Sequence, residues 1–269
     1  MVEMKTVIPK IDEDTGVAWL TLNRPEKKNA MSRGLMAEMI TLLKELRDND
    51  KIRCIVTTGA GNSYSSGLDL YDLRDSWKRK RRWDEGGSTY EIVRLLRAVP
   101  QVTVAAINGW CLGGGLALLN GHDLAVSCES AMFGMPEVIR GSYGAVATST
   151  LFHSGIPFKK AFYIQLTGRN LTAAEAERVG LVSQVVPDNQ LIPYVEQLAK
   201  EIGSAQRGDS GERQDRGLHG KGSGLRYGAE NRRSGVSPNE ILHQSLERRG
   251  RLSALAKGWR EHGLRQTGG

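Results

Sequence analysis

The sequence predicts an α/β fold in which parallel strands alternate with helices. Two short runs rich in strand-forming residues, Val17–Asn23 and Arg53–Gly59, end in turn residues, as strands do. Between them, apolar residues recur at helical spacing from Leu35 to Leu46, which indicates an amphipathic helix. A third run, Val102–Asn108, is mostly apolar and fits a strand that is covered on both faces. Alternation of this kind favours parallel pairing, because the intervening helix returns the chain to the same end of the sheet.

Capping residues mark the ends of two expected helices. Ser32 lies just before the apolar spacing and can cap the first helix. The T-x-x-E pattern from Thr172 to Glu175 is a capping box, and Gly180 can close the short helix that it opens. Asp123–Ser130 follows a second helical stretch and is expected to add a further strand.

Length and composition suit a globular protein without a membrane segment. The chain has 269 residues, 39% of them hydrophobic, enough for one large or two modest cores. No uninterrupted apolar run reaches the roughly 18 residues of a membrane span, and the first residues lack the apolar core of a signal peptide. We therefore expect a cytoplasmic location. Cys54, Cys111 and Cys128 show no CxxC spacing, so neither a disulfide framework nor a metal site is expected.

The positive charge of the chain is concentrated beyond Ser204. The formal charge is +7, but residues 1–204 hold 24 Lys and Arg against 23 Asp and Glu, whereas residues 205–269 hold 13 against 7 and 13 of the 32 glycines. We therefore divide the chain into a core, residues 1–204, and an atypical Gly/Arg-rich C-terminal region, residues 205–269, that is partly disordered or forms short helices. Such a composition fits either a natural disordered tail or a GC-rich gene read out of frame.

Three consecutive glycines, Gly113–Gly115, interrupt an apolar stretch between an expected strand and an expected helix. Glycine is unfavourable inside either element, so the triplet needs a physical reason. One reason is the approach of a ligand to bare N–H groups at the positive end of a helix. Tight packing or a strained turn would use the same residues. The phosphate-binding patterns GxGxxG and GxxxxGK[ST] are not present at this place.

Five segments, taken in order, carry a resemblance to a known family. They are LNRPEKKNAMS (22–32), SSGLDL (65–70), INGWCLGGG (107–115), HDLAVSCESAMFGMPEV (122–138) and LTGRNLTAAEAERVGLVSQVV (166–186). From about Val17 to Pro187 the sequence resembles the crotonase superfamily, also called the enoyl-CoA hydratase/isomerase superfamily. The resemblance implies a spiral of ββα units, usually assembled into trimers, that binds acyl-CoA thioesters and stabilises their enolates. It implies no cofactor other than the coenzyme A of the substrate.

The same resemblance implies roles for individual residues. The two oxyanion-hole N–H groups fall on Ser66 and Gly114, where fixed donors would favour the charge that develops on the thioester oxygen. The general acid/base falls on Glu137. Contacts with the substrate or with CoA are implied for Lys28, Ala30, Ser65, Gly67, Leu68, Asp69, Leu70, Trp110 and Gly113.

Ala117 departs from the family pattern, because hydratases of the family carry a glutamate there. The resemblance then implies an enoyl-CoA hydratase or isomerase in which Glu137 alone moves protons. Alternatives are a hydratase-lyase for aromatic enoyl-CoAs, suggested by the segment NGWC and by Tyr71, and a non-catalytic homologue that binds acyl-CoA or RNA. In a second departure, Gly141–Thr150, Tyr143 is placed to reshape the acyl pocket.

The remaining polar features are interpreted as structural. The basic run Trp77–Glu85 could meet CoA phosphates or RNA, but charge runs usually form a solvated helix face, so nucleic-acid binding is not expected. His122 and His153 lie outside the family's catalytic positions and are interpreted as structural histidines. Residues 205–235 lack the apolar stripe of the family's covering helices, so we expect a homotrimer or hexamer to be weakened.

Overall fold

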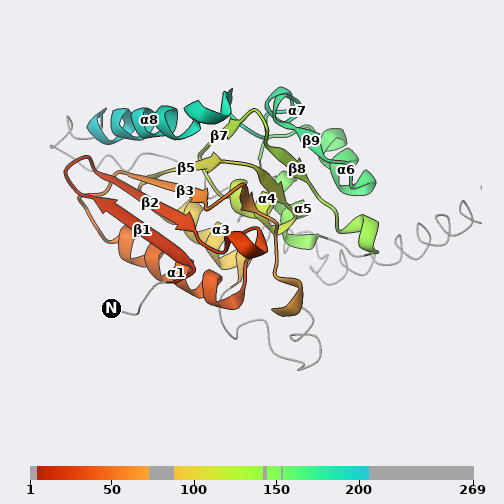
Figure 1. Cartoon of the computed structure of the whole chain (residues 1–269), viewed down its shortest axis with the longest axis horizontal. Helices are drawn as coiled ribbons and strands as arrows, with labels where there is room; N and C mark the ends of the chain where they lie inside the picture. Colours follow the sequence, from red (N-terminus) through yellow and green to blue (C-terminus); the bar gives the residue numbers. More distant parts are fainter. Residues whose placement is uncertain (1–4, 73–87, 142–143, 153, 206–269) are drawn as a thin grey trace, which may run out of the picture. The chain divides into compact units, whose positions relative to one another are not determined.

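The fold was analysed in a computed structural model, which describes residues 5–72, 88–141, 144–152 and 154–205 (Figure 1). Several features of the sequence analysis lie outside the described residues: the basic run 77–85, Tyr143 and His153. The predicted C-terminal region, residues 205–269, also lies outside them except for Ala205. The division of the chain at residue 204 therefore stays a prediction. None of the described helices is long and apolar enough to cross a membrane.

A six-stranded sheet forms the larger of two sheets. Its strands, in spatial order, are β1 (Val7–Asp12), β2 (Val17–Leu22), β3 (Cys54–Gly59), β5 (Val102–Ile107), β7 (Leu124–Cys128) and β10 (Gln184–Val186). Only the β1–β2 pair is antiparallel within this sheet; the other pairs are parallel. All six residues of β3 are buried, as expected for a central parallel strand covered on both faces. The predicted strands are present, each shorter than predicted by one to three polar residues at its ends.

The strands of a second, four-stranded sheet alternate in the sequence with strands of the first sheet. Its strands are β4 (Ser63–Ser65), β6 (Trp110–Leu112), β8 (Met132–Gly134) and β9 (Leu171–Thr172). Strand β4 follows β3 after three residues, β6 follows β5 after two, and β8 follows β7 after three. Helix α3 (Thr89–Ala98) comes after the first of these pairs and α4 (Gly114–Leu119) after the second. The chain thus repeats a ββα unit, which confirms the predicted spiral.

The helices cover both sides of the larger sheet. Helix α1 (Arg33–Arg47) contacts β1, β2 and α3, whereas α8 (Leu191–Ala205) contacts β3, β5 and β7 from the other side (Figure 1). The predicted apolar face of α1 is buried through Leu35, Met36, Met39, Ile40, Leu43 and Leu46. Further helical elements in the described residues are α5 (Ala145–Phe152), α6 (Phe158–Thr167), α7 (Ala173–Arg178) and the 3₁₀ turns η1 (Pro25–Lys27), η2 (Val138–Arg140) and η3 (Asp188–Gln190).

The predicted helix ends are confirmed. The Ser32 side chain accepts a hydrogen bond of 3.2 Å from the N–H of Leu35 at the start of α1. Thr172 and Glu175 form both hydrogen bonds of a capping box at the start of α7. Gly180 follows that helix at a φ of +80°, a left-handed conformation that glycine adopts without strain.

We expect Ser32→Ala to lower the free energy of unfolding by about 1 kcal/mol, because the N–H of Leu35 loses its acceptor. Urea denaturation measures the change. The matched control is Thr41→Ala, an exposed position of the same helix, which should change stability by less than about 0.5 kcal/mol. Equal losses in the two variants would contradict the capping role.

Candidate active site

The glycine triplet lies at the start of α4, where its members face different neighbours. Gly113 precedes the helix with a φ of +51°, a conformation that L side chains rarely adopt. A Cβ atom on Gly113 would lie 2.5 Å from Oε1 of Glu137. One on Gly115 would lie 2.5 Å from the carbonyl oxygen of Ser65. Close packing, the second of the two interpretations of this triplet, is therefore present in the folded chain.

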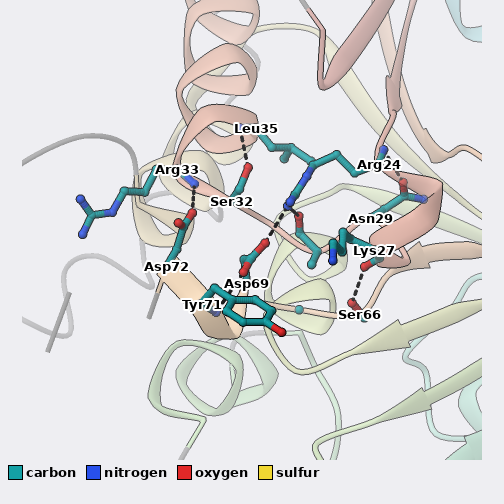
Figure 2. A network of polar contacts seen from close by, with 12 residues as sticks. Arg24, Lys27, Asn29, Ser32, Arg33, Leu35, Ser66, Asp69, Tyr71 and Asp72 are labelled. Atoms are coloured by element: carbon teal, nitrogen blue, oxygen red, sulfur yellow. Dashed lines mark hydrogen bonds and ion pairs between the residues drawn. The ribbon is translucent and has the colours of Figure 1, made fainter. Parts of the chain in front are cut away.

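The loop before α1 is fixed by a buried asparagine. The Asn29 side chain accepts a hydrogen bond from the N–H of Arg24 at 2.9 Å (Figure 2). Its amide group donates to the carbonyl oxygens of Ala60 at 2.9 Å and Ser63 at 2.6 Å. Lys28 and Asn29 both have positive φ, 50° and 53°. Asparagine tolerates this conformation better than most residues, and three hydrogen bonds offset its cost. The chain therefore turns sharply, and the carbonyl oxygen of Lys28 faces the loop after β4.

Ser66, predicted to supply an oxyanion-hole N–H, uses that group inside the protein. Its N–H donates to the carbonyl oxygen of Lys28 at 2.9 Å, and its hydroxyl donates to the carbonyl oxygen of Lys27 at 3.3 Å (Figure 2). A donor engaged in this way points into the neighbouring loop and cannot serve a ligand beside Gly114. The geometry therefore contradicts the prediction for Ser66.

The N–H group that approaches Gly114 is that of Leu68. A Cβ atom on Gly114 would lie 3.3 Å from the nitrogen of Leu68 and 2.7 Å from Cε of Met31. Met31 bonds to the residues on either side of Leu68: its N–H donates to Gly67 at 2.8 Å, and its carbonyl accepts from Asp69 at 3.1 Å. In such a bridge the N–H of Leu68 faces away from Met31. Among the described residues, none accepts a hydrogen bond from the N–H of Leu68 or of Gly114.

Gly67 allows this approach. Its φ is +95°, and a Cβ atom there would lie 2.9 Å from the carbonyl oxygen of Leu112 and 3.0 Å from the nitrogen of Gly114. A side chain would therefore be strained by the backbone conformation and would also press on the start of α4. Gly67 and Gly114 together let two stretches of main chain lie against each other.

Two other predicted contact residues are built into the protein. The Ser65 side chain is fully buried; its hydroxyl donates to the carbonyl oxygen of Asn29 at 2.9 Å and accepts from the N–H of Gly67 at 3.2 Å. Asp69 forms an ion pair of 3.0 Å with Arg24, with 9% of the Asp69 side chain exposed. Their side chains therefore hold the loop, and contact of these two residues with a substrate stays a prediction.

Glu137 is half-buried beside the glycine triplet. It immediately precedes η2. A Cβ atom added to Gly113 would lie 2.5 Å from Oε1 of Glu137, and one added to Gly144 would lie 2.9 Å from the same oxygen. Burial raises the pKa of the Glu137 carboxyl above its usual value, although its own backbone N–H and the charge of Arg140 act in the opposite direction. A carboxyl group with a raised pKa next to two N–H donors is suited to accepting and returning a proton.

The other predicted positions lie around this centre. Ala117 is fully buried in α4, so its side chain contributes to the core. Ala30 is also buried, with its carbonyl oxygen accepting from Arg24 at 2.6 Å. Leu70 is 57% exposed at the end of the loop, and Trp110 is half-buried in β6. The structure therefore brings Gly67, Leu68, Gly113, Gly114 and Glu137 together. The N–H of Ala117 donates to the carbonyl oxygen of Gly113 at 3.3 Å within this helix start.

His122 is a structural histidine, as predicted. Its Nδ1 lies 2.9 Å from the carbonyl oxygen of Leu118, which can only accept, so Nδ1 carries the proton. In the neutral ring Nε2 then accepts from the hydroxyl of Thr57 at 2.9 Å, and that hydroxyl accepts from Tyr64 at 2.8 Å. The chain of hydrogen bonds joins β3 and β4 to the end of α4.

Sequence reasoning missed three residues that shape the site. Asn29 carries a usable signal, because asparagine is enriched at left-handed turn positions. Arg24 gives none, since its partner Asp69 is 45 residues away in the sequence. Gly144 gives none either, because only the fold brings it against the carboxyl group of Glu137.

We expect Gly115→Ala to destabilise the protein by about 1–3 kcal/mol, because the added methyl group would lie 2.5 Å from the main-chain oxygen of Ser65. Gly34→Ala is the control: it is exposed in α1, its nearest neighbour would lie 3.9 Å away, and it should be neutral or stabilising. Thermal unfolding of both variants checks this. A neutral Gly115→Ala would show that the contact is not tight.

We expect Glu137→Gln to gain stability relative to the unsubstituted chain as the pH rises above the ordinary carboxyl value of 4.5. Because burial raises the folded-state pKa, the folded state holds the proton more tightly than the unfolded state, and stability falls with pH until the folded-state pKa is passed. Glutamine cannot ionise and avoids that loss. Melting temperatures of both proteins across pH 4 to 8 measure the difference, and a difference independent of pH would contradict the raised pKa.

Comparison with known proteins agrees with this geometry. The enoyl-CoA hydratase/isomerase family matches residues 12–209. A hydroxycinnamoyl-CoA hydratase-lyase of Pseudomonas fluorescens is 32% identical over 210 residues, which cover 74% of this chain and 72% of that protein.

Solved structures give the same result. A monofunctional enoyl-CoA isomerase from M. smegmatis is 33% identical with a TM-score of 0.61, covering 74% of this chain and 85% of its own. An enoyl-CoA hydratase/isomerase from Pseudoalteromonas atlantica T6c is 27% identical with a TM-score of 0.70, covering 88% and 91%. The family match spans well over half of the sequence, and the ββα spiral is the fold of these relatives. The chain therefore belongs to the enoyl-CoA hydratase/isomerase family.

Proposed function

We propose that this protein is an enzyme acting on enoyl-CoA thioesters, with the N–H groups of Leu68 and Gly114 binding the thioester oxygen and Glu137 transferring the proton. The observation that carries the proposal is the arrangement at the start of α4. Gly114 approaches the nitrogen of Leu68, and the adjacent Gly113 approaches the carboxyl group of Glu137. Two N–H groups and one carboxyl group thus lie around the start of α4.

The proposed chemistry depends on where negative charge develops during the reaction. When a base removes a proton next to a thioester carbonyl, negative charge develops on the carbonyl oxygen, and two fixed N–H donors stabilise that charge. Loss of one such donor typically costs about 2.7–4 kcal/mol of transition-state stabilisation. Glu137 takes the proton as a carboxylate and can return it as a carboxylic acid, for which a raised pKa is favourable. Proton transfer of this kind needs no cofactor beyond the coenzyme A of the substrate.

One carboxylate favours isomerisation over ordinary hydration. Hydration of a double bond needs a group that holds and activates water in addition to the group that protonates carbon. Ala117 supplies no such group. Moving a double bond requires only removal of a proton from one carbon and its return to another, which Glu137 can do alone. The 33% identity with an enoyl-CoA isomerase supports this choice.

A hydratase-lyase reaction on an aromatic enoyl-CoA is the second candidate. It is favoured by the 32% identity with a hydroxycinnamoyl-CoA hydratase-lyase. Tyr71, which is 66% exposed next to the loop of Leu68, offers an aromatic surface near the site. Three further points stay proposals. The substrate is contacted by Lys28, Ala30, Leu70 and Trp110, the protein assembles as a homotrimer or hexamer, and it is located in the cytoplasm.

We expect Glu137→Gln to lower kcat by about 10²- to 10⁴-fold on the accepted substrate while acyl-CoA still raises the melting temperature. The panel consists of 2-enoyl-, 3-enoyl- and hydroxycinnamoyl-CoA thioesters, followed by absorbance and product analysis. The control Glu129→Gln, an exposed position, should retain activity. Activity of Glu137→Gln within twofold of the unsubstituted chain would overturn the role of Glu137.

The panel also separates the candidate reactions. Conversion of 3-enoyl-CoA to 2-enoyl-CoA supports the isomerase, and release of an aromatic aldehyde from hydroxycinnamoyl-CoA supports the hydratase-lyase. Acyl-CoA binding without turnover of any thioester would instead support a non-catalytic homologue and overturn the enzyme proposal.

A further inference from the structure

An ion pair joins the two loops that hold the Leu68 N–H in place. Nη1 of Arg24 lies 3.0 Å from Oδ2 of Asp69 and also donates to the carbonyl oxygen of Ala30 at 2.6 Å (Figure 2). The side chains of Arg24 and Asp69 are only 17% and 9% exposed. One guanidinium nitrogen therefore connects the loop before α1 with the loop after β4.

Asp69 is held from three directions, directly after Leu68 in the chain. Its N–H donates to the carbonyl oxygen of Met31 at 3.1 Å, Oδ2 meets Arg24, and Oδ1 accepts from the N–H of Tyr71 at 3.0 Å. These contacts fix the peptide that follows Leu68. On the other side of Leu68, the carbonyl oxygen of Gly67 accepts from Met31 at 2.8 Å. With both flanking peptides fixed, the Leu68 N–H faces away from Met31, and Gly114 approaches the Leu68 nitrogen.

The pair persists in the ionised form. Burial on its own would raise the pKa of Asp69, but the hydrogen bonds from Arg24 and from the N–H of Tyr71, with the charge of Arg24, hold that pKa below its usual value. A largely dehydrated ion pair adds little net stability compared with apolar residues of the same size. Its value here is geometric, because the planar guanidinium fixes direction as well as distance.

We propose that Arg24 and Asp69 are positioning residues for the thioester-oxygen site, acting through the main chain of Leu68. This inference rests on the proposed function, since it assumes that the Leu68 N–H binds the thioester oxygen. Neither side chain touches the substrate. Their removal tilts the Leu68 donor away from the oxygen and weakens binding of the transition state more than binding of the substrate.

The test compares Asp69→Asn, Arg24→Lys and Arg24→Met in the full-length protein. Asparagine keeps the size and the Tyr71 contact of Asp69 but loses the charge; lysine keeps the charge of Arg24, and methionine keeps only its length. We expect kcat to fall about 10²-fold in Asp69→Asn and Arg24→Met, with KM changed less than twofold, and Arg24→Lys to recover part of the loss. The double variant Arg24→Met/Asp69→Asn should be no worse than either single change, because both remove one interaction.

Controls separate positioning from stability. All assays are run well below the melting temperature of each variant and are normalised to folded protein. Glu13→Gln breaks the exposed ion pair of 2.6 Å with Lys51, and it should leave kcat unchanged. Retention of kcat within twofold in Asp69→Asn and in Arg24→Lys would overturn the positioning role, as would equal activity of the lysine and methionine variants.

The outcome is distinguishable from failure of the proposed function. If Glu137→Gln is inactive while Asp69→Asn retains full kcat, only the positioning role fails. If Glu137→Gln retains full activity, the proposed function fails whatever the Arg24 and Asp69 variants do.

Discussion

The close contact between two stretches of main chain, residues 65–68 and 113–115, is the constraint on which the rest of the site depends. Strands β4 and β6 are parallel neighbours, so the loops that follow them leave the smaller sheet at the same edge. Glycines at 67, 114 and 115 remove the side chains that would keep these loops apart. Backbone groups of the two loops are thereby brought as close as side chains are in a packed core.

This contact imposes requirements on the surrounding chain. The loop after β4 must be held from behind, and the loop before α1 does so through the carbonyl oxygens of Lys28 and Met31. To present them, the chain adopts two consecutive left-handed residues, which cost of order 1–3 kcal/mol each. The buried amide of Asn29 and the ion pair of Arg24 with Asp69 supply the compensating interactions. The polar side chains of Asn29, Arg24 and Asp69 thus help to hold the two loops in contact.

The sequence predicted those features that depend on local spacing. The apolar face of α1, the cap at Ser32 and the capping box at Thr172 are each determined within a few residues, and each is present. The glycine triplet and Glu137 could be singled out because they belong to a recognisable motif. The role of each N–H group around Ser66 could not be predicted. Successive N–H groups of an extended loop alternate in direction, and the turn at Lys28 determines that the N–H of Ser66 is the one bonded inside the protein. The partner of Asp69 was hidden for a related reason, since it comes from a different loop.

The two N–H groups beside Gly114 belong to the main chain, and that has an evolutionary consequence. Substitution of a side chain deletes a carboxylate or a hydroxyl in one step, but it leaves a backbone donor in place unless proline is introduced. Under the proposed function, the groups at positions 117 and 137 can therefore be exchanged while the two N–H donors for the thioester oxygen are kept. Ala117, buried in α4 at the position where the family resemblance implies a glutamate in hydratases, fits such an exchange. In an enzyme built as proposed here, the reaction can diversify through one or two side chains, whereas the main-chain N–H donors are inherited with the fold.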